Sequence, residues 1–310
     1  MPTSRAAAAV AAATLVAVAA VATADKLYFA SHEGYDVGYF DPSGDPPTAV
    51  AYLDLLKLKK ADLPTGVAVD AAAGKVFWGN DDPNAASSGI SSGDLGNLAS
   101  SIKTIVDWSS GAVKDPEGMD LDKVNKIVYY ADQGKRAIYS VPYAGGTPTV
   151  VHQFGGSSAP FDVAVDHDMG GGTLGVFAAV PGVTDGHFSS NGQIVLIVGG
   201  RLTPLVSSMA YPYAVCLHRA KKLLFYVSGE KGAGAFCFHY GARGTPGCPK
   251  SSWSVPRYVM DCEVDEAAGH IYYTMPANST AGSIFRTALD GTDHVELQST
   301  LNKPFRLSLA

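Results

Sequence analysis

The stretch Pro64-Thr-Gly-Val-Ala-Val-Asp70 carries the pattern that predicts the fold. It begins with proline, continues through alternating apolar positions and ends in aspartate, and related stretches follow along the chain. The other copies are Pro116-Glu-Gly-Met-Asp-Leu-Asp122, Pro160-Phe-Asp-Val-Ala-Val-Asp166, Pro212-Tyr-Ala-Val-Cys-Leu-His218, Cys262-Glu-Val-Asp265 and Pro304-Phe-Arg-Leu-Ser-Leu-Ala310. Their final positions lie 44 to 52 residues apart, so the chain consists of repeats of about 48 residues.

Each copy is followed by an apolar-aromatic run, such as Lys75-Val-Phe-Trp78 or Lys126-Ile-Val-Tyr-Tyr130. Most units then contain a third and often a fourth short run. Runs rich in β-branched and aromatic residues, bounded by Gly, Pro, Asn and Asp, are typical of strands joined by turns. Four short strands per unit predict a propeller blade, because so small a sheet must pack against neighbouring sheets to bury both faces.

The two ends of the repeat region predict how the ring closes. The run Lys26-Leu-Tyr-Phe29 has the pattern of a second strand, but no proline-led strand precedes it. The copy at Pro304–Ala310 is a first strand without a second strand after it. We therefore expect residues 25–310 to form an all-β, six-bladed propeller of four-stranded antiparallel blades, whose C-terminal strand completes the first blade.

Residues 1–24 have the composition of a signal peptide. Arg5 gives a positive start, Ala6–Val21 is an unbroken run of small apolar residues, and Ala22-Thr-Ala24 is a cleavage site. The alternative is a membrane anchor, for which the run is short and rich in weakly hydrophobic alanine. We expect a secreted, extracellular protein without a membrane span, in which the sequon at Asn278 is a glycosylation site.

Composition limits the classes of partner. The chain has 23 basic and 29 acidic residues and a formal net charge of −6. A nucleic-acid-binding protein normally presents a basic face, so we expect no nucleic acid partner. Hydrophobic residues make up 46% of the chain, which is enough for a sizeable core and excludes wholesale disorder. We expect a monomer.

Several motifs match the sequence pattern of a functional site but lack the structural context that such a site requires. Gly89-Ile-Ser-Ser-Gly93 and Gly170-Gly-Gly-Thr-Leu-Gly175 resemble a nucleophile elbow and a dinucleotide loop, but neither leads into a helix. The oxygen-rich stretch Asn80–Asn84 could hold Ca²⁺, but we expect a solvated turn, because Asp, Asn and Pro all favour turns. The aspartates that end the repeats, with His218 in place of one of them, are expected to be structural and to accept backbone N–H bonds in the following turn.

The repeats resemble the class B (YWTD) repeats of low-density-lipoprotein receptors, which form six-bladed β-propellers. The resemblance rests on Gly66-Val-Ala-Val-Asp70, on Phe77-Trp-Gly-Asn80, Tyr129-Tyr-Ala-Asp132 and Tyr272-Tyr-Thr-Met275 as degenerate YWTD tetrapeptides, and on Leu289-Asp-Gly291. It implies a propeller that binds protein or peptide ligands on one face. The chain lacks the cysteine-rich modules of those receptors, which favours a lone secreted propeller.

The four cysteines predict up to two disulfides, with buried thiols as the alternative. Cys216 and Cys262 fall on adjacent first strands, offset by one position in the repeat. Because successive side chains of a strand point to opposite faces, the two thiols are expected to meet between neighbouring blades. Cys237 and Cys248 are then left to close a hairpin.

First strands line the channel of a propeller, so equivalent positions should surround one mouth. The two positions after the repeat proline contain aromatic, arginine and acidic residues, which are common in binding hot spots. We predict a ligand-binding ring that recognises an extracellular protein, peptide or glycan, although plain packing of blade corners would use the same positions. The ring consists of Glu117, Phe161, Asp162, Tyr213, Arg257, Tyr258, Phe305 and Arg306.

An enzyme remains the alternative. Secreted propellers of the lactonase and strictosidine-synthase kind are similar in architecture, and some hold a divalent metal such as Ca²⁺ in the channel. The oxygen ligands to test for this interpretation lie just after second-strand runs: Glu33, Asn80, Asp132, Glu230 and Asn278. The binding protein that we favour needs no cofactor, metal or catalytic residue.

Overall fold

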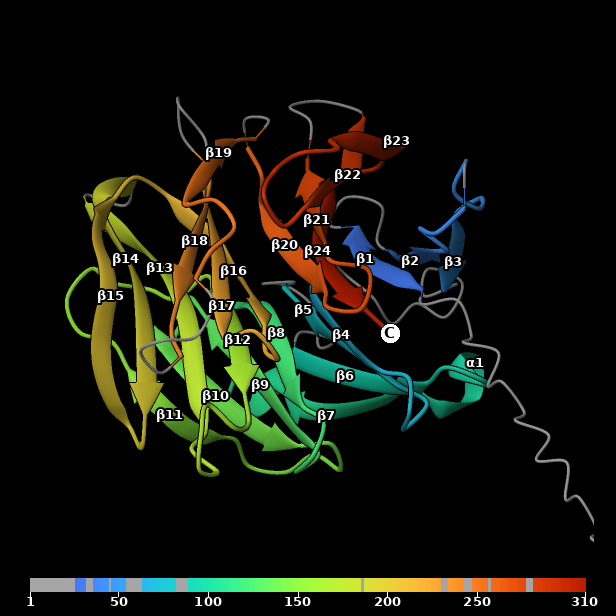
Figure 1. The fold of residues 1–310 in the computed structure, drawn as a ribbon. Coiled ribbons are helices and arrows are strands. Elements are labelled where there is room, and N and C mark those ends of the chain that lie inside the picture. Colours follow the sequence, from blue (N-terminus) through green and yellow to red (C-terminus); the bar gives the residue numbers. More distant parts are fainter. Residues whose placement is uncertain are drawn as a thin grey trace, which may run out of the picture.

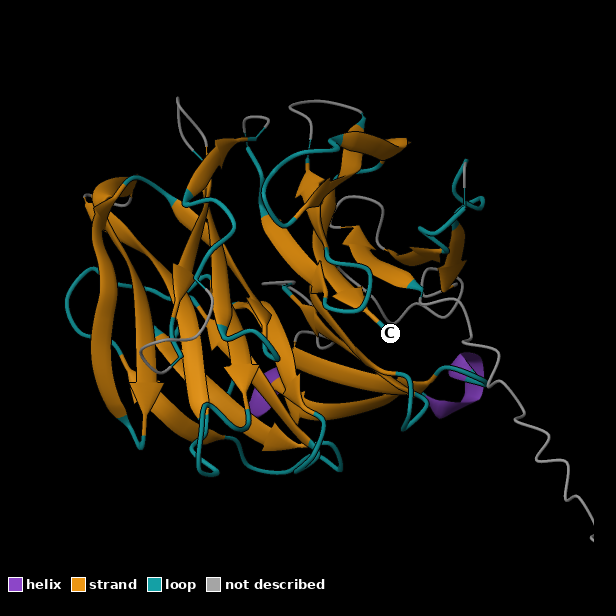
Figure 2. Ribbon diagram, viewed as in Figure 1, coloured by secondary structure: helices purple, strands orange, loops and turns teal. Residues whose placement is uncertain are grey.

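In a computed structural model of the protein, the proline-led repeats form the innermost strands of six four-stranded antiparallel sheets that surround a central axis (Figure 1). The structure describes residues 26–31, 36–44, 46–53, 63–81, 89–184, 187–229, 234–241, 247–255, 258–276 and 281–310. The predicted six-bladed, all-β architecture is confirmed, and strands dominate the ribbon (Figure 2). The predicted signal peptide and the sequon at Asn278 lie outside the described residues.

Blade 1 joins strands from opposite ends of the sequence. Strand β24 (Pro304–Leu309) pairs antiparallel with β1 (Leu27–Ser31), and β2 (Asp36–Phe40) and β3 (Ala51–Leu53) complete the sheet. In Figure 1 the red β24 lies beside the blue β1. The predicted closure of the ring by the C-terminal strand is therefore confirmed.

Blades 2 to 6 each take four strands that are consecutive in sequence. From the innermost strand outward they are β4 (Pro64–Asp70), β5 (Lys75–Asn80), β6 (Gly89–Asp94) and β7 (Lys103–Asp107); β8 (Pro116–Asp122), β9 (Ile127–Asp132), β10 (Ala137–Pro142) and β11 (Thr149–Gln153); β12 (Asp162–Asp166), β13 (Gly175–Thr184), β14 (His187–Val198) and β15 (Arg201–Met209); β16 (Pro212–His218), β17 (Leu223–Ser228), β18 (Gly234–His239) and β19 (Ser252–Ser254); and β20 (Asp261–Asp265), β21 (His270–Met275), β22 (Gly282–Ala288) and β23 (Val295–Leu301). Gly89–Gly93 thus belongs to a strand, and Gly170–Gly172 lies in the turn before β13, as expected of chance matches.

Helices are short and peripheral in the described residues. They are α1 (Leu98–Ser101) and the 3₁₀ turn η1 (Trp108–Ser110), both in blade 2. Neither has the length or apolar character needed to cross a membrane.

The core is divided among the blade interfaces. Six clusters of buried apolar side chains each combine residues of two neighbouring blades, for example Phe77 with Tyr130 and Phe177 with Leu224. Each blade therefore buries both faces against its neighbours, which is the reason that a ring is stable where one blade would not be.

The disulfides are those that the repeat predicted. Cys216 on β16 is bonded to Cys262 on β20 and links the inner strands of blades 5 and 6, while Cys237 on β18 is bonded to Cys248 in the segment before β19. All four cysteines are paired. Both bonds are consistent with an oxidising, extracellular type of environment.

The repeat aspartates hold the turns between first and second strands. Asp70 Oδ1 accepts from Ala73 N at 2.9 Å, and Asp122, Asp166 and Asp265 accept similar bonds. His218 occupies the equivalent position, where its Nδ1 accepts from Lys221 N at 3.3 Å. Their predicted structural role is confirmed.

Two of these aspartates also join neighbouring blades. Asp70 Oδ2 accepts from Lys126 Nζ at 2.8 Å and from the Tyr143 hydroxyl at 3.2 Å, both in the next blade. Asp166 Oδ2 accepts in the same way from Lys222 Nζ at 2.7 Å and the Tyr240 hydroxyl at 2.9 Å. We call this arrangement of Asp, Lys and Tyr the interblade latch.

Candidate functional site

Arg306 lies at the centre of the ring. It extends from β24 between the inner strands and is 1% exposed. Its Nη2 donates to the carbonyl oxygen of Phe161 at 2.6 Å, and its Nη1 donates to that of Met260 at 3.1 Å. One side chain from blade 1 therefore contacts the residues that directly precede the inner strands of blades 4 and 6.

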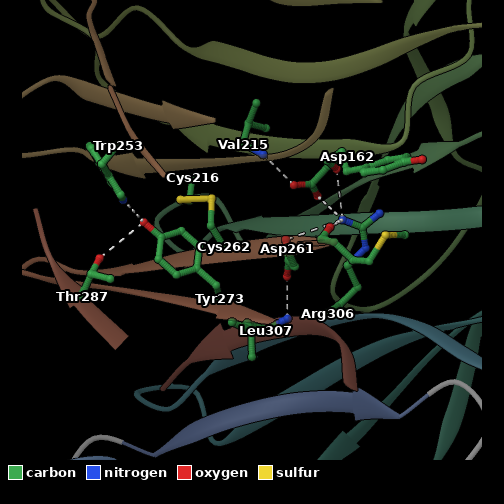
Figure 3. The surroundings of a disulfide bond; sticks show 12 residues. Asp162, Val215, Cys216, Trp253, Asp261, Cys262, Tyr273, Thr287, Arg306 and Leu307 are labelled. Carbon is green, nitrogen blue, oxygen red and sulfur yellow. Dashed lines mark hydrogen bonds and ion pairs between the residues drawn. A yellow bond between two sulfur atoms is a disulfide. The ribbon is translucent and has the colours of Figure 1, made fainter. Parts of the chain in front are cut away.

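Three buried carboxylates surround the guanidinium. Nη1 lies 3.5 Å from Oδ1 of Asp162 and 3.5 Å from Oδ1 of Asp261 (Figure 3). Nη2 lies 3.7 Å from Oε2 of Glu117. Burial raises the pKa of Asp162 to about 6 although Arg306 opposes the change, and it raises the pKa of Glu117 well above its ordinary value. Burial and the neighbouring Asp162 likewise raise the pKa of Asp261.

The carboxylates also hold blades together through backbone groups. Asp162 Oδ2 accepts from Val215 N at 2.9 Å, and Asp261 Oδ2 accepts from Leu307 N at 2.6 Å (Figure 3). Each of these bonds connects a blade to the next one in the ring. Ion pairs and backbone hydrogen bonds thus link blades 1, 3, 4 and 6 in a cluster that we call the plug, which consists of Arg306, Glu117, Phe161, Asp162 and Asp261.

A second charged layer lies deeper in the channel. Arg219 Nη2 donates to Asp120 Oδ2 at 2.5 Å, and the same carboxylate oxygen accepts from Val165 N at 2.7 Å. Burial and the neighbouring Asp120 raise the pKa of Glu263 to about 7. A cavity of about 20 Å³ lies among Asp120, Glu263 and the plug, which is room for a single water molecule. Side chains therefore fill the channel at this level.

Aromatic rings cover the outer side of the plug. The guanidinium carbon of Arg306 lies 4.6 Å from the ring centre of Phe161 and 5.3 Å from that of Phe305. The Tyr213 ring lies 5.3 Å from that of Phe161 and 6.1 Å from that of Tyr211. Tyr211, Tyr213 and Phe305 are half-buried, so they present part of their rings to solvent at the mouth of the channel.

The structure brings most residues of the predicted ring together, but some of them are buried and others are partly exposed. Phe161 and Glu117 are buried, as are Asp162 and Arg306, whereas Tyr213 and Phe305 remain partly exposed. Tyr258 is 49% exposed and lies two residues before Met260, whose carbonyl Arg306 contacts. Arg257 lies outside the described residues. We define the aromatic rim as Tyr211, Tyr213, Tyr258 and Phe305; its role in ligand binding stays a prediction.

An acidic group beside the plug was not predicted from the sequence. Burial and the neighbouring carboxylates of Asp81 and Asp132 raise the pKa of Asp115 to about 7, and Asp81 also forms a hydrogen bond with it. Asp115 directly precedes Pro116, and Asp81 directly follows β5. The positions of the two aspartates could have revealed the pair. The start of a first strand lies beside the end of a second strand, as the pairing of Pro64 with Asn80 shows. Asp115 precedes a first strand and Asp81 follows a second strand, so both lie at the same end of the blades.

Of the five residues proposed as metal ligands, the structure describes Asp132 and Asn80, and the metal site stays a prediction. Asp132 accepts hydrogen bonds from the backbone N–H groups of Lys114, Asp115 and Lys135, which occupy most of its acceptor capacity. Asn80 is fully buried, and Glu33, Glu230 and Asn278 lie outside the described residues. Within the described part of the chain, no three His, Cys, Asp or Glu side chains are placed to hold a metal ion.

Comparisons with known proteins support the fold. No protein-family model matches the chain, and no curated protein matches its sequence. A chain of the nidogen–laminin complex superposes with a TM-score of 0.69 at 14% identity, covering 92% of this chain and 98% of that one. TolB from Acinetobacter baumannii gives 0.64 at 11% identity, covering 93% and 66% of the two chains. A gluconolactonase from Xanthomonas campestris gives 0.56 at 14% identity over 78% of each chain.

At these identities the likeness shows a shared propeller fold and nothing of function. The fold that the resemblance to low-density-lipoprotein receptors implies is confirmed. Membership of the class B repeat family stays a prediction.

Proposed function

We propose that the protein is a secreted, non-catalytic propeller that recognises an extracellular protein, peptide or glycan through the aromatic rim. The observation that carries the proposal is the plug beneath the rim. Arg306 and its carboxylates are bound to one another and to backbone groups, while the aromatic rings above them face solvent. A rigid aromatic surface on a fixed polar base favours recognition of a ligand by contact.

Two rim residues have backbone conformations that large side chains rarely adopt. Tyr211 has a φ of 49° and Tyr258 a φ of 63°. Leu63 and Lys303 occupy the same position of their repeats and have φ angles of 51° and 46°. The conformation therefore belongs to the turn before each of these inner strands, and it places both tyrosines at the same end of the blades.

The compartment and the neighbours are consistent with this function. Two disulfides suit an extracellular protein, which agrees with the signal peptide expected at residues 1–24. The nidogen chain that shares the fold is found in a complex with laminin. A class B propeller that acts alone in the extracellular space, as a monomer, would combine these features.

The test is binding of the purified protein to peptide and glycan arrays, followed by affinity measurements with the ligand found. The double variant Tyr213→Ala/Tyr258→Ala should lower that affinity about tenfold or more. The control is Tyr52→Ala, because Tyr52 is 47% exposed but lies on the outermost strand of blade 1. Equal losses for control and rim variants would reject the rim, and stoichiometric metal together with lactone hydrolysis would favour the enzyme.

A further inference from the structure

The latch is incomplete at the interface where blade 6 meets blade 1. Asp265 corresponds to Asp70 and Asp166, and its Oδ1 accepts from Ala267 N at 3.0 Å and Ala268 N at 2.8 Å. Its Oδ2 has no hydrogen-bond donor among the described residues, although Asp265 is only 7% exposed. This is the oxygen that binds lysine and tyrosine in the two complete latches.

The register of the strands shows what replaces the missing groups. Tyr143 lies four residues after Tyr139, which pairs with Tyr130 of the second strand. In blade 1 the equivalent pair is Gly38 with Phe29, so Pro42 stands at the position of the latch tyrosine. The position of the latch lysine corresponds to residue 25, which is an aspartate in the sequence and lies outside the described residues.

A pocket of about 310 Å³ occupies the place of the missing latch. Its walls include Pro42, Ala267 and Ala268, and Asp265, His270 and Arg286 also line it. Apolar walls with one unpaired carboxylate oxygen suit a ligand that has an alkyl stem and a cationic tip.

The charged groups at the pocket sum to a net negative charge. Arg286 lines the pocket, and its Nη2 lies 3.8 Å from Oδ2 of the largely exposed Asp293, so the two carboxylates of Asp265 and Asp293 outweigh its single positive charge. Burial and the positive charge of Arg286 lower the pKa of His270, against the opposing effect of Asp265 and Asp293. His270 is therefore neutral at pH 7, and a cation entering the pocket meets a net negative charge.

We propose that the pocket between blades 6 and 1 binds the primary alkylammonium group of a lysine side chain, with Asp265 Oδ2 as its acceptor. The molecule itself contains two examples of this recognition, since Lys126 and Lys222 place their ammonium groups 2.8 and 2.7 Å from the equivalent oxygens. The turn aspartates and the repeat prolines lie at opposite ends of the inner strands. The site is thus separate from the aromatic rim and does not depend on its function.

The test uses N-acetyl-lysine N-methylamide as the probe, with its norleucine analogue as the neutral comparison. Titration followed by NMR should show the lysine compound shifting the His270 ring resonances of the wild-type protein, and the norleucine compound should leave them unchanged. 1,5-Diaminopentane separates the two sources of such a group. Tighter binding of the lysine compound supports a lysine side chain of a peptide partner, whereas tighter binding of the diamine would assign the pocket to a free amine and overturn the proposal.

Two variants make the result specific. Asp265→Asn keeps the Oδ1 that holds the turn and replaces Oδ2 with a donor, so affinity for the lysine compound should fall about tenfold or more. Pro42→Tyr restores the latch hydroxyl, fills the pocket and should abolish binding. Asp122→Asn alters the same kind of turn in blade 3 and should leave binding unchanged. Equal binding of the lysine and norleucine compounds, or unchanged affinity in both pocket variants, would overturn the proposal.

Discussion

Arg306 stabilises the closed ring and also favours it over other arrangements of the blades. A buried guanidinium is costly to desolvate, and the three carboxylates around it would be costly without it. Its contacts reach blades 3, 4 and 6 from blade 1, so the ion pairs form together only when the ring is closed. The plug therefore favours one arrangement of blades over any partly open one.

Replacing Arg306 should have a far larger effect than replacing a surface arginine. Arg306→Met leaves Glu117, Asp162 and Asp261 buried without a cation, and we expect a loss of about 3–5 kcal/mol in the free energy of unfolding at pH 7. The loss should be smaller at pH 5, where these carboxylates take up protons. Urea denaturation measures both values, with Arg201→Met as the exposed control; similar losses in the two variants would contradict the prediction.

At the residue scale, the sequence predicted which residues lie at the same end of the inner strands, but it did not predict how deeply each of them is buried. Equivalent repeat positions placed Glu117, Phe161 and Arg306 at one end of the inner strands, and the structure has them in contact. The pattern could not show that Arg306 points inward and is buried, because that depends on carboxylates from three other blades. The latch lysines were also missed: Lys126 and Lys222 have left-handed backbone conformations where glycine stands in other turns.

At the scale of elements, the two disulfides should contribute unequally. Cys216 and Cys262 are 46 residues apart and Cys237 and Cys248 are 11 apart. Loop-closure entropy assigns about 4 kcal/mol to the first bond and about 3 kcal/mol to the second. The pairwise alanine variants should therefore differ in denaturation midpoint, with the Cys216/Cys262 variant less stable; the reverse order would refute the entropic account.

The strand order could be predicted because each blade repeats the same local pattern. Proline-led first strands and aromatic second strands were expected at the places where β4, β5, β8 and β9 are found. The long hairpin of β13 and β14 was not expected, since its extension past Val180 lacks the repeat pattern and depends on pairing between residues 182 and 189. The repeat is visible as a local sequence pattern, whereas pairing between two strands of a blade produces no such pattern.

At the scale of the whole molecule, buried acids set the response to pH. The pKa values of Asp115 and Glu263 are raised to about 7 and that of Asp162 to about 6, mainly by burial. Between pH 4 and 7 the folded state therefore binds more protons than the unfolded state, and stability falls as pH rises through this interval.

The opposite effect appears only in stronger acid. Burial raises the pKa of Asp70, but hydrogen bonds from Lys126 and the turn outweigh it and hold the pKa below its ordinary value. Stability from this latch is lost as pH falls below about 4. Thermal unfolding should give a higher midpoint at pH 5 than at pH 8, and Glu263→Gln should reduce the difference. A midpoint that rises from pH 5 to pH 8 would refute the prediction.

Strand β24 follows every other strand in the sequence, so five blades leave the ribosome before the residue that neutralises their facing carboxylates. A translation product that stops before Arg306 keeps Glu117, Asp162 and Asp261 opposed without a counter-charge. It also leaves the inner edge of β1 unpaired, and such edges attract chaperones and aggregation partners. Pairing with β24 therefore conceals an edge that any product ending before this strand would expose.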